Sequence, residues 1–367
     1  IASNTSSLPE VVGNAEALFD PTDAAAISET MARGLTDADY RERLLASGRQ
    51  QATQFSWERT ATIALASLEA LVAEKPRTEQ RAQIEHTLPT RIAKRLAGLA
   101  PQFGQVQPEP LAECLAVNLP LRRSRQFLID VTELQQRDSR TGIQRVVRSL
   151  LIALMAEPPL GFVALPVYFD SGGRYRYANR FLETFMGQQA APDELVDFGA
   201  ADVYLGLDFN ITSTSLSEAV FRALSRRGVR LCFVVYDMLP LLRPEWWPPE
   251  MSPKYERWLR ALASVADDIC CISAAVADEV SEWLALTGVK GPYAQPAVRH
   301  FHLGADLSSS APSRGWPEGY EAVRAALDND SPTFLMVGTI EPRKGHAEVI
   351  EAFDQLWAAG HALNLVV

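Results

Sequence analysis

The sequence has few of the residues that build metal centres and disulfide frameworks. Its 367 residues include four cysteines and five histidines. The cysteines form neither a C-x-x-C pair nor a cluster with histidine, which excludes the common zinc and redox motifs. Three of them lie in apolar runs, where we expect buried free thiols in a reducing cytosol. The four are Cys114, Cys232, Cys270 and Cys271.

Several other signals are also missing. No apolar stretch approaches the roughly 18 residues that a membrane-spanning helix needs. The sequence contains no Walker A loop, no G-x-G-x-x-G fingerprint, no nucleophile elbow and no HExxH motif. A net charge of -10 argues against nucleic-acid binding as the main role. The chain starts at Ile1 with no methionine and no signal peptide, so we expect its start to be internal to a longer reading frame.

Short apolar runs alternate with helical patterns over residues 126–304, and this alternation predicts a parallel, doubly wound α/β sheet. Ser273 is expected to cap one of the helices, and Ser252-Pro253 is expected to start another. The expected strands are 126–132, 162–168, 203–207, 231–236, 269–272 and 298–303, and the expected helices are 143–154, 215–227, 252–266 and 274–286. His300 and His302 alternate on the last strand, but no third ligand is close in sequence, so we expect no metal there.

The first part of the chain has helices but almost no strands on which to pack them. Asp23 and Ser56 are expected helix caps within residues 1–75. Residues 76–125 carry scattered prolines and are expected to be an interdomain linker. The linker ends in a locally basic run, for which a solvated face is expected and contact with an anionic membrane is the alternative.

The most informative stretch is residues 333–346, which predicts a strand, a tight loop and a helix. Arg343 and Lys344 would lie just before the helix, whose N-terminal N–H groups and dipole favour a phosphate. The alternative is an ordinary pair of surface cations. Gly142 would similarly let backbone N–H groups approach a phosphate, or it merely permits the turn into its helix, and Arg145 would lie in the first turn there.

Further candidates follow the expected strand 231–236. Asp237 lies where ligands of open α/β sheets bind, and the alternative is that it caps the next turn. Trp246, which is next to Trp247, either stacks on a sugar ring or packs its proline-rich loop.

These motifs resemble those of family 4 retaining glycosyltransferases of the GT-B fold. Residues 337–346, Val-Gly-Thr-Ile-Glu-Pro-Arg-Lys-Gly-His, resemble the opening of the nucleotide-sugar-binding domain. Three further stretches resemble the closing third of such a glycosyltransferase: Ser-Ser-Leu-Pro-Glu-Val-Val-Gly at 6–13, Leu-Phe-Asp-Pro at 18–21 and Phe-Ser-Trp-Glu at 55–58. The acceptor-side domain resembles the stretches at 130–133, 141–145, 236–240 and 272–273. The resemblance implies a GT-B-type α/β fold of Rossmann-like doubly wound parallel sheets.

The resemblance also implies an order of domains. Residues 1–75 would be the C-terminal part of a donor-side domain, and 126–304 the N-terminal acceptor-side domain. Residues 305–367 would be the truncated start of a second nucleotide-sugar-binding domain. Two glutamates that the family places ahead of the first segment are absent, so we expect the isolated chain to be inactive. The remaining donor contacts are expected beyond Val367.

Site roles are implied residue by residue. Lys344 matches the family lysine that holds the donor's diphosphate. Gly338, Thr339, Gly142 and Arg145 are also expected to bind the donor. Many members carry an arginine directly after the glycine, where this chain has Thr339, so Arg343 would take over that duty. Asp237 would be catalytic or would orient a hydroxyl. The family's usual histidine before it is replaced by Tyr236, which is expected, with Trp246, on the acceptor side.

The implied reaction is transfer of a hexose from a nucleotide diphosphate sugar, with retention and without a metal or other cofactor. The acceptor would be a growing polysaccharide such as a lipopolysaccharide O-chain. The expected location is cytoplasmic, either free or in peripheral contact with the inner membrane or other glycan-assembly enzymes. The main alternative is a non-catalytic GT-B-like module that binds glycan or a partner. A Rossmann oxidoreductase is disfavoured because no dinucleotide fingerprint follows an expected strand.

Overall fold

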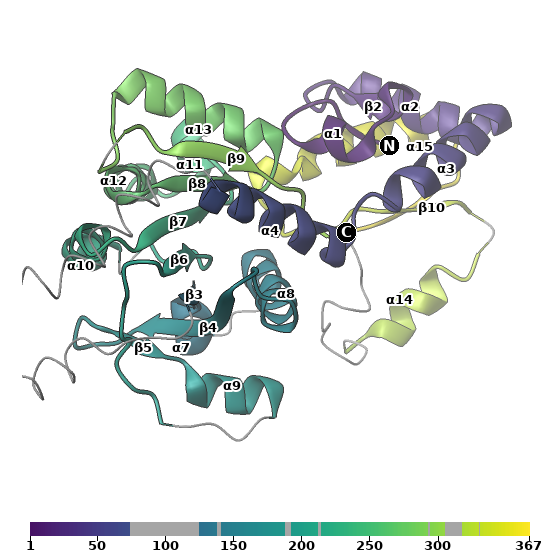
Figure 1. Ribbon diagram of the computed structural model, residues 1–367. Coiled ribbons are helices and arrows are strands. Elements are labelled where there is room, and N and C mark those ends of the chain that lie inside the picture. Colours follow the sequence, from purple (N-terminus) through teal and green to yellow (C-terminus); the bar gives the residue numbers. More distant parts are fainter. Residues whose placement is uncertain are drawn as a thin grey trace, which may run out of the picture.

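A computed structural model describes residues 1–73, 125–137, 141–187, 192–211, 214–292, 294–304, 318–329 and 331–367. The expected linker, apart from Arg125, and Cys114 lie outside these ranges. Residues 125–304 form a large lobe, and residues 1–56 with 318–367 form a small lobe (Figure 1). Helix α4 (Trp57–Ala73) runs from the small lobe along the large one.

The large lobe is built on one seven-stranded sheet with the order β5-β4-β3-β6-β7-β8-β9. All neighbouring strands are parallel except β4 and β5, which pair antiparallel at one edge. The parallel α/β prediction is therefore confirmed, while the short edge strand was not predicted. The strands are β3 (Arg125–Asp130), β4 (Phe162–Phe169), β5 (Tyr175–Tyr177), β6 (Val203–Gly206), β7 (Arg230–Val235), β8 (Asp268–Cys271) and β9 (Ala297–His300).

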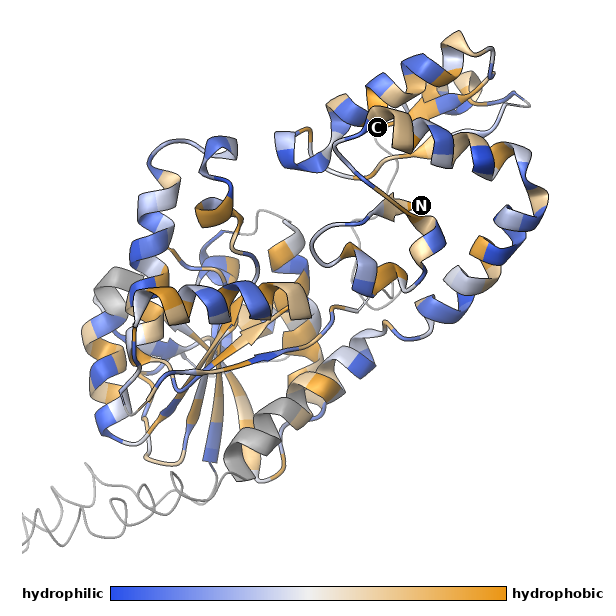
Figure 2. Cartoon of the chain, turned by 90° about the horizontal axis from the view of Figure 1, so that it is seen from above, coloured by the Kyte–Doolittle hydropathy of each residue, from blue (hydrophilic) through white to orange (hydrophobic). Residues whose placement is uncertain are grey.

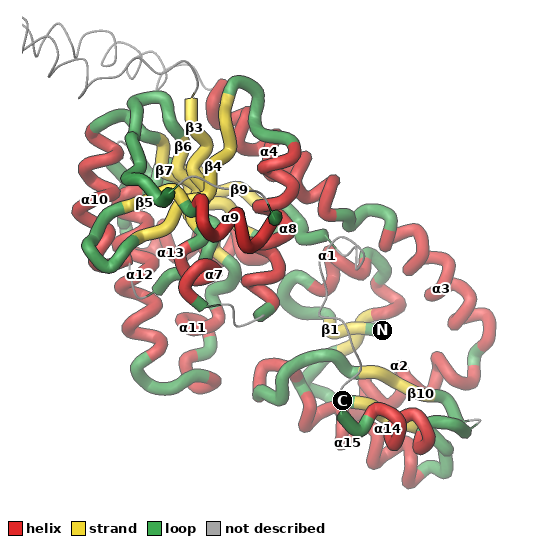
Figure 3. The backbone as a smooth tube through the Cα atoms, turned by 90° about the horizontal axis from the view of Figure 1, so that it is seen from below, coloured by secondary structure: helices red, strands yellow, loops and turns green. Residues whose placement is uncertain are grey.

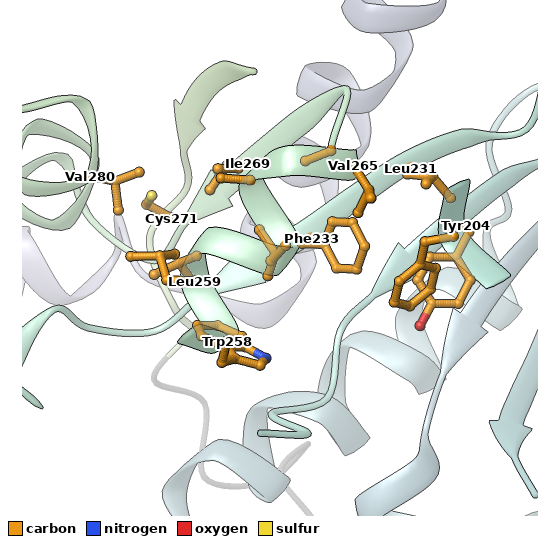
Figure 4. Close-up of a cluster of buried hydrophobic side chains, with 14 of the residues drawn as sticks. Tyr204, Leu231, Phe233, Trp258, Leu259, Val265, Ile269, Cys271 and Val280 are labelled. Atoms are coloured by element: carbon orange, nitrogen blue, oxygen red, sulfur yellow. The ribbon is translucent and has the colours of Figure 1, made fainter. Parts of the chain in front are cut away.

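Helices cover both faces of this sheet. One core cluster packs α10, α12 and α13 against one face, and Trp258, Leu259 and Phe233 belong to it (Figure 4). A second cluster packs α8 and α4 against the other face. Cys232, Cys270 and Cys271 are buried free thiols, as expected. The helices are α7 (Thr132–Gln136), α8 (Gly142–Ala156), α9 (Asn179–Met186), α10 (Thr214–Arg226), α11 (Leu239–Leu242), α12 (Met251–Val265) and α13 (Ala274–Thr287).

The small lobe is formed by both ends of the chain, which meet in Figures 2 and 3. Its core joins Ile27 and Met31 of α2 to Phe353 and Leu356 of α15. The helices that had no strands to pack on in the sequence therefore pack on the opposite end of the chain. The elements are β1 (Ala2–Ser3), α1 (Leu8–Val12), η1 (Ala15–Ala17), β2 (Leu18–Phe19), α2 (Ala24–Thr36), α3 (Ala38–Ala52), α14 (Tyr320–Ala326), β10 (Thr333–Leu335), η4 (Pro342–Lys344), α15 (His346–Ala358) and β11 (Asn364–Val366). Assignment of the two ends to separate units stays a prediction.

Three of the expected helix starts are confirmed, while α12 begins at Met251, one residue before the start expected at Ser252, and has no side-chain cap. The Asp23 carboxylate accepts the N–H groups of Ala25 and Ala26. Ser56 Oγ accepts the Arg59 N–H at 3.0 Å. Ser273 Oγ accepts the Val276 N–H at 3.2 Å. These caps satisfy N–H groups that a helix leaves open, so the sequence placed these three helix starts correctly.

The two lobes are joined around the segment that leaves β9. Thr60 Oγ1 donates to the His302 carbonyl at 2.7 Å, and the Phe55 ring meets the His302 ring edge-on at 5.6 Å. A Cβ added at Gly304 would lie 2.4 Å from the Trp57 nitrogen, which leaves no room for a larger residue. The start of α4 is therefore packed tightly onto the end of the large lobe.

Glu10 adds a charged contact at the same place. Its carboxylate accepts the N–H groups of Ala274 (3.2 Å) and Ala275 (3.4 Å) in the first turn of α13, and pairs with His302 Nε2 at 2.7 Å. Partial burial raises the pKa of Glu10, but the hydrogen bonds from His302 and the two amides outweigh burial and hold the pKa below its ordinary value. A carboxylate from the small lobe thus occupies an anion-favouring helix N-terminus of the large lobe.

We predict that Glu10→Gln weakens the junction between the lobes. Because the folded-state pKa of Glu10 is lowered, its contribution is present above the ordinary value of 4.5 and is lost as the pH falls through the folded-state pKa. The variant should lose about 1 kcal/mol of unfolding free energy near neutral pH. Denaturant titration at neutral and acidic pH measures this loss, which should shrink in acid. The control Glu16→Gln, in an exposed ion pair with Arg43, should change little.

Asp208 follows β6 and is a second buried carboxyl group with a local structural role. Its oxygens accept the N–H groups of Leu134 (2.7 Å) and Phe209 (2.9 Å). Burial raises the pKa of Asp208 to about 7, and the neighbouring Asp130 and Glu133 add to the rise. The native protein therefore keeps this proton over a pH range in which the unfolded chain has lost it.

We predict a fall in stability from this group as the pH rises. Its contribution is complete below about pH 4 and is lost as the pH passes about 7. Asp208→Asn cannot ionise, so its unfolding free energy should rise relative to wild type by up to about 4 kcal/mol across this range. Asparagine has one hydrogen-bond acceptor fewer, and this loss changes the unfolding free energy by the same amount at every pH. Denaturant titrations at several pH values measure the difference, and Asp354→Asn, on the exposed side of α15, is the control. Parallel wild-type and Asp208→Asn curves would contradict the prediction.

Candidate active site between the lobes

The loop between β10 and α15 brings Gly338 and Lys344 together. A Cβ added at Gly338 would lie 3.6 Å from Lys344 Cγ, so the stem of the lysine packs over the glycine. Gly345 follows with φ +71°, a left-handed conformation that glycine adopts without strain. It ends the short helix η4 and leads directly into α15. Lys344 is thereby placed beside the N-terminus of α15, as the sequence predicted.

Glu341 organises the same loop and was given no role by the sequence. One of its carboxylate oxygens accepts the Thr339 hydroxyl at 2.5 Å, and the other accepts Arg343 Nε at 2.5 Å. The hydrogen bond from Thr339, followed by the one from Arg343, lowers the pKa of Glu341 below its ordinary value. The spacing of two residues to each partner is the only sequence signal for this arrangement.

Residues of the large lobe meet this loop. The Arg343 guanidinium lies over the Trp247 ring, 5.5 Å from its centroid. Burial raises the pKa of Asp237, while the N–H of Leu239 and the positive charges of Arg343 and Lys344 act to lower it. Arg343 and Lys344, from the C-terminal part of the chain, therefore lie near the carboxyl group of Asp237 in the large lobe.

Asp237 has the structural role that the sequence offered as an alternative. Its Oδ1 accepts the Leu239 N–H at 3.2 Å, so it does cap the turn into α11. Its backbone carbonyl accepts the Tyr255 hydroxyl at 2.5 Å, which fixes the end of β7 against α12. A catalytic role for Asp237 stays a prediction, and its position opposite Arg343 and Lys344 favours one.

The two adjacent tryptophans differ in their surroundings. Trp246 ends the short helix η3 (Pro244–Trp246), and its ring lies 5.6 Å from the guanidinium of Arg243, a residue of its own segment. Trp247 instead contacts the small lobe through Arg343. Sugar stacking by Trp246 stays a prediction, and the contact between the lobes belongs to its neighbour.

Tyr236 lies in the core of the large lobe. Its side chain is 6% exposed, and its hydroxyl donates to the Leu207 carbonyl at 2.8 Å. Burial, with the nearby Asp208, raises the pKa of this hydroxyl well above its ordinary value. The acceptor contact expected of Tyr236 stays a prediction, while its placement favours packing.

Gly142 and Arg145 lie in the first turn of α8. Thr141 caps this helix by accepting the Gln144 N–H at 3.3 Å. A Cβ added at Gly142 would meet none of the described residues within 4 Å, and its backbone is not left-handed. Both explanations that the sequence offered for Gly142, close approach of a phosphate and easing of the turn, therefore stay open. Arg145 is exposed. Binding by either residue stays a prediction.

The structure adds Glu279 to the neighbourhood of Asp237. It lies half-buried on α13, and burial followed by the nearby charge of Asp237 raises its pKa. The sequence could not single it out because α13 carries several acidic residues. Within the described ranges, no group of three or more His, Cys, Asp or Glu could hold a metal ion. Independence from metals stays a prediction. In the same part of the chain, no helix is long and apolar enough to cross a membrane.

Comparison with known proteins relates this geometry to an activity. The chain is 38% identical over 371 residues to a serotype-specific mannosyltransferase WbdA of Escherichia coli, with all of this chain and 43% of that protein aligned. A second protein of that name and organism is 36% identical over 373 residues, with 45% of its length aligned. The homologues are glycosyltransferases.

The chain spans less than half the length of these relatives. A shorter match, 48% identical over 62 residues, joins 17% of the chain to 16% of an O-antigen chain mannosyltransferase B of Escherichia coli. No protein-family model matches the chain. The similarity covers the whole chain, so it includes both ends that form the small lobe.

Proposed function

We propose that this chain is part of a retaining hexosyltransferase of the GT-B type, similar to family 4, which uses a nucleotide diphosphate sugar. The observation that carries this proposal is the approach of Arg343 and Lys344 to Asp237 and Trp247 of the other lobe. Similarity along the whole of this chain to part of proteins named mannosyltransferases favours mannose as the hexose. The acceptor we propose is a growing surface polysaccharide such as an O-chain, in keeping with the name of the shorter relative.

The proposed chemistry requires stabilisation of a leaving group. The bond between the anomeric carbon and the diphosphate oxygen breaks while the acceptor hydroxyl oxygen forms the new bond to that carbon. The hydroxyl proton passes to the departing diphosphate, on which negative charge develops. Arg343, Lys344 and the N-terminus of α15 would stabilise that charge without a metal. Asp237 would orient a hydroxyl of the sugar or acceptor. The cytoplasm is the proposed location because nucleotide sugars are made there, and contact with the inner membrane would serve the acceptor.

We predict that Lys344→Ala weakens donor binding by about tenfold or more, because a charged hydrogen bond to phosphate is lost. Isothermal titration of the 367-residue chain with nucleoside diphosphate hexoses measures the dissociation constant. Lys290→Ala, an exposed lysine after α13, is the matched control and should leave the constant unchanged. Equal affinity of wild type and Lys344→Ala would remove Lys344 from the donor site.

We also predict that the isolated 367-residue chain transfers little sugar. The sequence contains no pair of glutamates eight positions apart, which is the spacing that the resembled family uses at the donor. Incubation with nucleoside diphosphate mannose and an oligosaccharide acceptor, followed by mass spectrometry of the products, measures transfer. Robust turnover would show that these residues suffice for catalysis.

The alternative from another class is a non-catalytic binding module. A GT-B-like scaffold without full catalytic equipment would bind glycan or a partner enzyme. Titration with the same nucleoside diphosphate hexoses separates the two functions. A glycosyltransferase would bind at least one of them, whereas a glycan-binding module would bind none.

A further inference from the structure

We propose that Trp247 is a positioning residue that holds Arg343 of the opposite lobe ready for the donor's diphosphate. This inference rests on the proposed function and adds a residue from the large lobe to a site otherwise built by the small lobe. It makes donor binding dependent on contact between the two lobes.

The guanidinium of Arg343 is restrained on two sides. Its Nε donates to the Glu341 carboxylate at 2.5 Å, which fixes one edge of the planar group. The Trp247 ring lies against it, with 5.5 Å from the guanidinium carbon to the ring centroid. The Arg343 side chain is 24% exposed, so the contact is partly shielded from water. A guanidinium held in this way keeps the N–H groups of its two terminal nitrogens for an anion, with little rotamer freedom left to lose on binding.

Glu341 makes this arrangement electrostatically workable. Arg343 and Lys344 are adjacent cations, and their charges repel when no anion is bound. The carboxylate of Glu341 offsets one of them, while its second oxygen is engaged by Thr339. The ring of Trp247 adds a cation–π attraction that needs no further negative charge at the site. The site therefore keeps net positive character toward a diphosphate.

The tryptophan itself has an unfilled hydrogen-bonding group. Its indole Nε1 is buried and finds no hydrogen-bond partner within the described part of the chain. A buried indole N–H is ordinarily paired, so Trp247 lies against Arg343 without a hydrogen bond from its own ring among the described residues to fix it there. The adjacent Trp246 lies beside Arg243 of its own segment, so among the described cations only Trp247 of the two tryptophans meets one from the small lobe.

A double-mutant cycle tests the proposal. Wild type, Trp247→Ala, Arg343→Ala and the double variant are titrated calorimetrically with nucleoside diphosphate mannose and with inorganic pyrophosphate. Trp247→Ala should weaken binding about three- to thirtyfold when Arg343 is present. It should weaken binding less than about twofold when Arg343 is absent, because its effect acts through that residue.

Conservative variants separate positioning from folding. Trp247→Phe keeps an aromatic face under Arg343 and should retain most of the affinity, while Trp247→Leu should behave like Trp247→Ala. Thermal unfolding monitors the fold of each variant, and the phenylalanine–leucine comparison decides the question if the alanine variant unfolds. Trp283→Ala is the matched control, since Arg260 lies over Trp283 at 5.6 Å, and it should leave the affinity unchanged.

If wild type binds the donor and the effects of Trp247→Ala and Arg343→Ala are additive, the positioning role is overturned and the proposed function still stands. A folded wild type that binds neither nucleotide sugar nor pyrophosphate would overturn both. The expected result is that the effect of Trp247→Ala on affinity vanishes in the Arg343→Ala background and that Trp247→Phe retains most of the affinity.

Discussion

The packing of α15 on α2 is the contact on which the rest of the small lobe depends. Phe353 and Leu356 on one helix are buried against Ile27 and Met31 on the other, and these helices come from opposite ends of the chain. Strands β10 and β11 form only a two-stranded sheet, and Leu335 is 70% exposed. So small a sheet cannot hold a functional loop by itself. The loop that carries Arg343 and Lys344 is therefore held in place by the N-terminal segment.

The large lobe contributes the complementary part of the site. Parallel strands end along one edge of the sheet, so Asp237 after β7 is placed by backbone hydrogen bonding and by the cap that it forms. The chain then continues through η3 to Trp247, which extends toward the small lobe. Positive charge on one lobe thus meets a carboxyl group and an aromatic face on the other, an arrangement suited to holding a diphosphate beside a polar sugar.

Further contacts maintain the junction between the lobes. Glu10 bonds the first turn of α13, while α4 packs along α8 and is fastened to the end of β9. The alignment with the mannosyltransferases covers the whole of this chain and less than half of those relatives, so both lobes lie within the aligned region. The contact between Arg343 and Trp247 is consequently one of several that join residues distant in sequence.

The sequence by itself determined the alternation of strands and helices, three helix caps and the place of Lys344 before α15. These features depend on side-chain periodicity and on residues within one turn of each other, so local order is enough to reveal them. Local order did not predict three other features: the burial of Tyr236, the bond between Glu341 and Arg343, and the contact between His302 and Glu10. Only the tertiary structure decided that α2 packs on α15 and that Trp247, rather than Trp246, meets Arg343. Such pairings join segments far apart in the chain, and the energy that selects them is the burial and charge complementarity of surfaces that exist only after folding.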